Sequence, residues 1–100
     1  GVQTCALPIW LSSRKAAGAG LRLAEMADNT AAILAIELLC GAQAVEFHRP
    51  LRSSPLLERA HALVRNVAEP WERDRQMAPD IAAVSRLIQK GGFADLCPAA

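Results

Sequence analysis

The sequence contains no tyrosine, and its only aromatic residues are two tryptophans and two phenylalanines. Its core must therefore consist mainly of aliphatic side chains and alanine, a composition that suits closely packed helices. The net charge is +1, with 11 basic and 10 acidic residues, so no bulk electrostatic attraction to nucleic acid or to an anionic membrane is predicted. Because 52% of the 100 residues are hydrophobic, the composition also argues against intrinsic disorder.

Familiar catalytic and metal-binding motifs are also absent. The sequence has no glycine-rich phosphate loop, no cluster of cysteines and histidines, and no nucleophile motif. Its three cysteines, Cys5, Cys40 and Cys97, are far apart and form no Cys-x-x-Cys pair, which is typical of reduced thiols in a cytoplasmic protein. We therefore predict no catalytic, cofactor-binding or metal-binding residue in this chain.

The longest apolar run, residues 31–45, does not predict a membrane span. A transmembrane helix needs about 20 apolar residues, whereas this run is shorter and contains Glu37 and Gln43. The N-terminus also lacks a basic region followed by a long apolar segment, so we expect no signal peptide. We expect no association with a membrane.

A long central helix is the strongest structural prediction. Polar residues at Arg22, Glu25 and Asn29 recur at helical spacing, and from residue 31 to 42 the only charge is Glu37. A helix that is apolar all round must be covered all round, and the rest of this chain is too small to do so. We therefore expect the helix to lie inside a larger bundle, with Cys40 as a small core residue.

Glu37 is the most conspicuous charge on this helix. A charge among apolar residues is costly unless it is paired. We expect a buried ion pair with an arginine from another helix, and we favour this over a role in an active site. Gly41, four residues further on, is expected to let a neighbouring helix approach closely.

Residues 1–11 are predicted to be a non-native stretch. They show no periodicity that continues into the following sequence, and residues 1–9 match the peptide encoded by one frame of a common sequencing adapter. The helical region proper is then 12–100, with the long helix at about 13–47. Gly18 and Gly20 weaken its beginning by about 1 kcal/mol each relative to alanine, so we expect fraying there. Pro50 ends it, because a proline disfavours helical geometry at the preceding residue.

Two shorter helices are predicted, at about 55–67 and 79–90, which makes the fold class all-α. Ser54 caps the first of them, and Pro55 occupies its first turn. Its inward stripe excludes His61 and Arg65, and we expect His61 to be a surface residue without a metal. The second helix ends at Lys90, with two glycines beyond, and Phe93 and Leu96 are positioned to fold back onto it. Between the helices, residues 71–75 (Trp-Glu-Arg-Asp-Arg) are expected to form a surface loop anchored by Trp71; a polar clamp on a partner is the alternative.

Three blocks of sequence carry a resemblance to a known family. Residues 26–39 read MADNTAAILAIELL, residues 49–58 read RPLRSSPLLE, and residues 71–81 read WERDRQMAPDI. In content, order and spacing these blocks resemble the C-terminal region of bacterial histidine ammonia-lyases, which belong to the aromatic amino acid ammonia-lyases. The resemblance covers roughly residues 16–98, although residues 11–20 and Gln76 depart from the family pattern.

The resemblance implies a cytoplasmic, largely helical homotetramer with long helices of four subunits packed together. Such enzymes convert L-histidine into trans-urocanate and ammonia with a methylidene-imidazolone (MIO) group made from an internal Ala-Ser-Gly, and with a tyrosine as base. This chain contains neither an Ala-Ser-Gly tripeptide nor a tyrosine. The family's Gln-Glu pair would fall at about residues 9–11, but this chain has no glutamine and no glutamate there. The full-length parent protein is thus expected to be a lyase, and this 100-residue chain alone is expected to be inactive.

Two alternatives stay open at this point. The chain could be a standalone helical module that associates with itself through its long helix. It could also be part of a tyrosine or phenylalanine ammonia-lyase, since these enzymes share the fold. Upstream sequence separates an enzyme fragment from a standalone module, because an enzyme of this family needs several hundred further residues.

Overall fold

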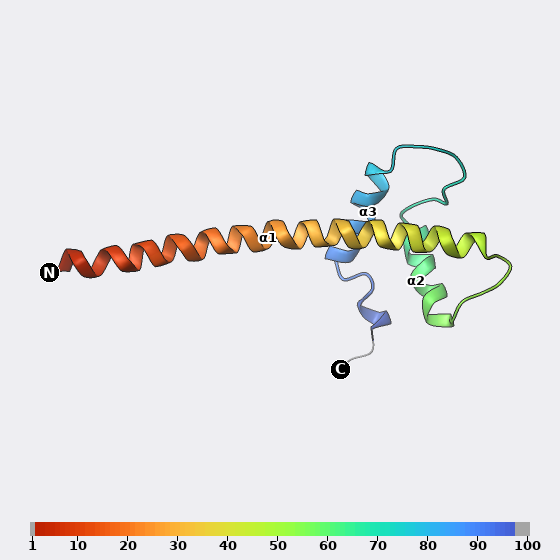
Figure 1. The fold of residues 1–100 in the computed structure, drawn as a ribbon. Coiled ribbons are helices and arrows are strands. Elements are labelled where there is room, and N and C mark those ends of the chain that lie inside the picture. Colours follow the sequence, from red (N-terminus) through yellow and green to blue (C-terminus); the bar gives the residue numbers. More distant parts are fainter. Residues whose placement is uncertain (1, 98–100) are drawn as a thin grey trace.

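A computed structural model describes the backbone of residues 2–97 and the side chains of residues 15–97. The elements in chain order are α1 (Val2–Phe47), α2 (Pro55–Arg65), α3 (Ala78–Gln89) and a short 3₁₀ helix, η1 (Ala94–Leu96). The predicted all-α class is confirmed, since these elements are all helical and the described residues contain no strand. In Figure 1, α1 is a long rod, and α2 and α3 lie beside its C-terminal part only.

Helix α1 begins at Val2, about ten residues before the predicted start at 13. The helix passes through Pro8, and through Gly18 and Gly20, where fraying was expected, without a break. Asn29 and Thr30 do not break it either, because Thr30 Oγ1 donates a 2.7 Å hydrogen bond to the carbonyl of Met26 one turn earlier. Whether residues 1–11 are native stays a prediction.

Among the described residues, the stretch 15–47 of α1 is long and apolar enough, by length and composition alone, to cross a membrane. This differs from the expectation based on residues 31–45, because the helix continues well beyond that run. Only 22% of its most apolar window is buried within the chain. The core helix of a larger protein has the same composition, so this property does not by itself indicate a membrane.

The end of α1 and the start of α2 lie where the sequence predicts them. The Arg49–Pro50 peptide bond after α1 is cis, and α2 begins at Pro55 with Ser54 as its N-cap, whose side chain accepts a 3.4 Å hydrogen bond from the backbone N–H of Leu57. Arg49 and Glu58 join the two ends of the connector through two hydrogen bonds of 2.8 and 2.9 Å. The connector is thus fixed at both ends.

Helix α3 also ends as predicted. The backbone N–H of Gly92 donates to the carbonyl of Leu87, and that of Gly91 donates to the carbonyl of Ile88, which together form a Schellman motif. Gly91 has a φ of 73°, a conformation that glycine adopts without steric cost. A Cβ atom on Gly92 would collide with the side chain of Leu87.

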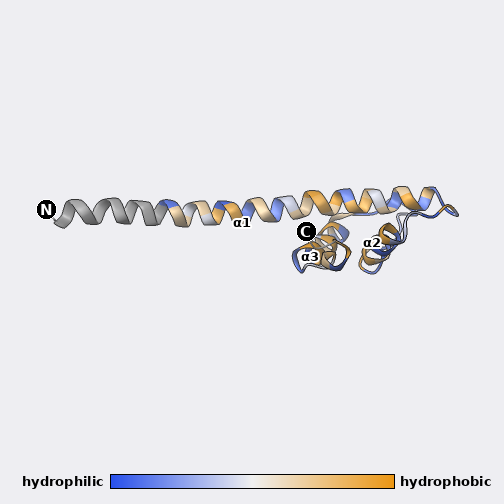
Figure 2. Cartoon of the chain, turned by 90° about the horizontal axis from the view of Figure 1, so that it is seen from below, coloured by the Kyte–Doolittle hydropathy of each residue, from blue (hydrophilic) through white to orange (hydrophobic). Residues whose placement is uncertain are grey.

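A small core lies where α2 and α3 pack against the C-terminal part of α1. Its buried residues are Ala35, Leu39, Ala42, Val64, Ala68 and Val84. Alanines on α1 let the other helices approach closely, and α3 makes the more extensive contact with α1. In α3, Val84 is buried and Ile81 and Ile88 pack against the core, as the sequence predicts. In α2, Val64 is buried, whereas Leu56 at the start of the helix is 47% exposed. Figure 2 shows α2 and α3 together on one side of α1.

The C-terminal tail folds back, but not only onto α3 as predicted. Phe93 packs against the core, while η1 contacts α2. Leu96 lines a shallow groove together with Ala62 and Leu63 of α2. The turn of the chain at Gly91 and Gly92 redirects the tail away from the axis of α3, which explains the difference.

Candidate functional site

The densest group of polar side chains lies where α2 faces the end of α1. Glu46 Oε1 is 2.8 Å from His61 Nε2 and 3.0 Å from Arg65 Nε. The side chains of His61 and Arg65 are each only 13% exposed. The prediction that His61 lies on the surface is therefore wrong, since one turn of α2 directs both His61 and Arg65 at the same carboxylate.

This cluster fixes the ionisation of Glu46. The hydrogen bond from Arg65 is the largest cause that lowers the pKa of the Glu46 carboxyl group, and the hydrogen bond and charge of His61 lower it further. Partial removal from water acts in the opposite direction. Glu46 is consequently held as a carboxylate that accepts hydrogen bonds, and it is unsuited to donate a proton in catalysis near neutral pH.

Gln43, one turn before Glu46, extends the cluster to the loop between α2 and α3. Its Oε1 atom accepts a 2.8 Å hydrogen bond from the backbone N–H of Trp71, and its Nε2 atom donates to the Trp71 carbonyl at 3.4 Å. Arg65 Nη2 also donates to Gln43 Oε1 at 3.4 Å. The side-chain amide thereby satisfies the backbone of the loop in the way a neighbouring strand would.

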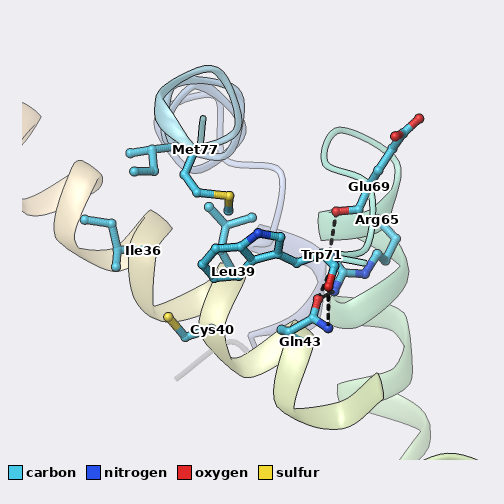
Figure 3. Close-up of a pocket in the computed structure, with 9 residues that line it drawn as sticks. Ile36, Leu39, Cys40, Gln43, Arg65, Glu69, Trp71 and Met77 are labelled. Carbon is cyan, nitrogen blue, oxygen red and sulfur yellow. Dashed lines mark hydrogen bonds between the residues drawn. The ribbon is translucent and has the colours of Figure 1, made fainter. Parts of the chain in front are cut away.

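Beside this cluster lies a mainly apolar groove of about 140 Å³. In Figure 3 the Trp71 side chain lies between Gln43 and Met77, with Leu39 of α1 next to it. Trp71 is 42% exposed, which fits its predicted role as the anchor of a surface loop. The groove brings together one thiol, one thioether and aliphatic side chains with the polar side chains of Gln43, Arg65 and Glu69. Gln43 and Arg65 are already engaged in the hydrogen bonds described above.

The loop is held by a further ion pair that the sequence did not reveal. Arg75 Nη1 lies 2.5 Å from Asp80 Oδ2, and Arg75 Nη2 donates a 2.9 Å hydrogen bond to the carbonyl of Glu69. Asp80 is only 8% exposed, so this carboxylate in the first turn of α3 depends on Arg75. The one usable signal was the five-residue spacing of Arg75 and Asp80 across the predicted start of a helix.

Three expectations for the middle of α1 are wrong within this chain. Glu37 is exposed and makes no ion pair with any residue that the structure describes. Cys40 is exposed rather than a core residue, and no other residue lies close to the space that a Cβ on Gly41 would occupy. All three lie beside the strip of Ala35, Leu39 and Ala42 on which α3 packs, and not within it. Cys40 lines the groove next to Trp71 and Met77.

The described part of the chain therefore presents a structural site. Its titratable side chains include no group of three histidine, cysteine, aspartate or glutamate residues placed to hold a metal ion. The carboxylates near His61 and Arg75 are already engaged by those residues. The arrangement fastens α2 and the loop to α1 and activates no nucleophile.

Comparison with known proteins identifies the family. The sequence profile described as Aromatic amino acid lyase matches residues 14–66, just over half of the chain. This chain belongs to the aromatic amino acid lyase family. The family therefore accounts for α1 from residue 14 onwards and for all of α2.

Its relatives among curated proteins include several lyases. A histidine ammonia-lyase of Desulfotalea psychrophila is 53% identical over 75 residues, which are 75% of this chain and 15% of that protein. The histidine ammonia-lyase of Aromatoleum aromaticum is 49% identical over 80 residues, 80% of this chain and 15% of that protein. One from Legionella pneumophila is 48% identical over 73 residues. This aromatic amino acid lyase chain thus spans about 15% of the length of these relatives.

Proposed function

We propose that this chain is part of a histidine ammonia-lyase, an enzyme that converts L-histidine into trans-urocanate and ammonia. The observation that carries the proposal is the identity of 45–53% to relatives that all bear this name. The three blocks at residues 26–39, 49–58 and 71–81 support it further, since they correspond to α1, the fastened connector with the start of α2, and the loop that leads into α3.

In this proposal the chain supplies structure and not chemistry. The MIO group that the family resemblance implies forms from Ala-Ser-Gly, and the chain contains neither that tripeptide nor a tyrosine. Its residues do not fit that group, so we assign no catalytic step to them. The role of this chain is to position α2 and α3 against the C-terminal part of α1 through Glu46, Gln43 and Arg75.

We further propose that the parent enzyme is a cytoplasmic homotetramer that binds neither nucleic acid nor a membrane. The exposed side chains of Ile33, Leu34 and Ile36 support the assembly, with exposures of 58%, 42% and 46%. An apolar surface of this kind on a helix marks a site of contact with protein. Charged residues distributed among the apolar ones, including Glu37, favour a protein environment over lipid.

Expression of the complete gene tests the proposed activity. The purified product should release urocanate from L-histidine, measured by ultraviolet absorbance, and should act far more slowly on L-tyrosine and L-phenylalanine. Preference for either aromatic substrate would replace histidine ammonia-lyase by the corresponding relative. The 100-residue chain alone should produce no urocanate above background, and turnover by it would refute the proposed division of roles.

A further inference from the structure

The groove beside Trp71 adjoins a second, wider groove at the end of α1. The wider groove has a volume of about 510 Å³, and Phe47 of α1 and the loop residues Glu72, Arg73 and Asp74 are among the residues that line it. Cys40 and Trp71 line both grooves. We call the two adjoining grooves together the Trp71 groove. It brings the exposed end of α1 and the loop before α3 to one continuous surface.

Two of the four aromatic residues of the chain lie in the Trp71 groove and are open to solvent. Phe47 is 79% exposed and Trp71 is 42% exposed. Figure 3 shows the Trp71 side chain beside Leu39, with Cys40 and Gln43 on the neighbouring turns of α1. Exposed aromatic rings beside a hollow are typical of surfaces that recognise a partner, because a ring buries a large apolar area on contact.

The loop that carries Trp71 is already fixed in position. Gln43 accepts a 2.8 Å hydrogen bond from the backbone N–H of Trp71 and donates to its carbonyl at 3.4 Å. Arg75 donates a 2.9 Å hydrogen bond to the carbonyl of Glu69, on the other side of Trp71. A partner that docks here would therefore not have to order the loop, which lowers the entropic cost of binding.

The rim of the Trp71 groove is acidic, although the whole chain has a net charge of +1. Glu69 lines the smaller part, and Glu72 and Asp74 line the wider part with a single base, Arg73. None of these four side chains belongs to an ion pair within the part of the chain that the structure describes. Arg65, the other base that lines the groove, is already paired with a carboxylate of α1. The free charges therefore favour a cationic partner.

We propose that the Trp71 groove is the docking site for a protein segment that carries a lysine or arginine next to a large apolar side chain. The smaller part, about 140 Å³, is close to the volume of about 150 Å³ that holds a benzene ring, so it accepts the apolar side chain. The cation then lies against the exposed ring of Trp71, beside the carboxylates of Glu72 and Asp74. An anionic lipid surface or a nucleic acid would be repelled by the same rim.

This inference goes beyond the proposed lyase function and does not rest on it. It gives residues 71–75 the role of a polar clamp on a partner, which the sequence analysis names as the alternative to a plain surface loop. The ion pair of Arg75 with Asp80 holds the clamp, while the residues between Trp71 and Arg75 stay free for the partner.

Titration with two matched peptides tests the recognition of a cation. The probes are amidated peptides with the sequences Lys-Leu-Lys and Glu-Leu-Glu, each flanked by glycine. In a Trp10→Phe background Trp71 is the single tryptophan, so its fluorescence reports occupancy of the groove. The Lys-Leu-Lys peptide should change the emission in a saturable way that weakens as salt is added, and the Glu-Leu-Glu peptide should not. Equal binding of both peptides, or of neither, would refute the proposal.

Charge reversals locate the acidic rim. Glu72→Lys and Asp74→Lys, both at exposed positions, should each raise the dissociation constant of the Lys-Leu-Lys peptide about fivefold, and Arg73→Glu should lower it about threefold. Glu25→Lys is the matched control, since it is exposed and lies about 22 Å along α1 from Cys40. It should change nothing, and an equal effect there would show that only the net charge of the chain matters.

Protection of Cys40 from alkylation locates the bound peptide. In a background with Cys5 and Cys97 changed to serine, saturating Lys-Leu-Lys peptide should slow the reaction of Cys40 with iodoacetamide at least about threefold, because Cys40 lines both parts of the groove. Glu72→Lys, which leaves the loop contacts in place, should reduce this protection at the same peptide concentration. Binding without protection would place the peptide elsewhere and overturn the assignment.

The product of the complete gene distinguishes a separate partner from the rest of the parent chain. It should bind the Lys-Leu-Lys peptide as the 100-residue chain does. Binding by the 100-residue chain only would mean that the parent covers the Trp71 groove itself, and would refute docking of a separate protein. Urocanate production is measured independently of both results, so failure of this proposal and failure of the lyase proposal remain distinguishable.

Discussion

The two halves of α1 share one helix but differ completely in their surroundings. Between residues 31 and 47, a buried position recurs every three or four residues, at Ala31, Ala35, Leu39 and Ala42. Between residues 15 and 30, every residue is exposed, although Leu21, Leu23 and Met26 are as apolar as their counterparts. The difference shows that burial in this chain is decided by where α2 and α3 reach, and not by the composition of α1. A helical stretch without tertiary contacts is only marginally stable in water, so the proposed assembly would stabilise the exposed half.

A matched pair of substitutions tests the difference between the two halves of α1 most directly. Ala24 and Ala35 lie 11 residues apart, close to three turns, on the same side of α1. Ala35→Asp buries an unpaired carboxylate beside α3 and should lower the free energy of unfolding by about 3 kcal/mol or more. Ala24→Asp should change it by less than about 0.5 kcal/mol. Urea denaturation followed by circular dichroism measures both.

The matched pair also has a clear contrary outcome. Equal losses for Ala24→Asp and Ala35→Asp would mean that residues 15–30 are covered on that side in solution. Such a result would therefore count against the described separation into a covered and an exposed half.

A second substitution tests how the loop before α3 helps to hold α3 against the C-terminal half of α1. Arg75→Ala leaves Asp80 without its ion-pair partner and removes the hydrogen bond to Glu69. Because the side chain of Arg75 is 31% exposed, we expect a loss of about 1–2 kcal/mol rather than the larger cost of a fully buried pair. Arg73→Ala, in the same loop but exposed, is the control and should be nearly neutral. Comparable thermal shifts for both variants would show that Asp80 does not depend on Arg75.

The N-cap of α2 should contribute less to the free energy of unfolding than the Arg75–Asp80 ion pair does. Ser54→Ala removes the acceptor for the backbone N–H of Leu57, and the 3.4 Å length of that bond places the expected loss near about 0.5–1 kcal/mol. Ser53→Ala changes a neighbouring hydroxyl that caps nothing in the described structure and should have no measurable effect. Faster amide exchange in the first turn of α2 should accompany the loss in the first variant only.

Local sequence signals predicted the ends of the helices, but the sequence did not predict the side-chain contacts between residues far apart in the chain. Ser54, Pro55 and Gly91 act within a few residues along the chain, so the sequence alone identified the N-cap of α2 and the glycine turn that ends α3. The contacts of Glu46 with His61 and Arg65 join residues 15 to 19 positions apart, and no periodicity within one helix indicates them. Glu37 was expected to be paired because its helix is apolar all round, yet its partner is not among the described residues of this chain.

The connector between α1 and α2 should make the stability of the fold depend on pH. The Arg49 hydrogen bonds, followed by the backbone N–H of Ser53, lower the pKa of Glu58 from 4.5 to about 2. A carboxyl group with a lowered pKa in the folded state stabilises the fold above its unfolded pKa and loses that contribution as pH falls. This contribution should therefore disappear between about pH 4.5 and 2. Nuclear magnetic resonance titration of the Glu58 carboxyl carbon should give a midpoint near 2, and Arg49→Ala should move it towards the ordinary value; an unchanged midpoint in that variant would show that Arg49 is not the cause.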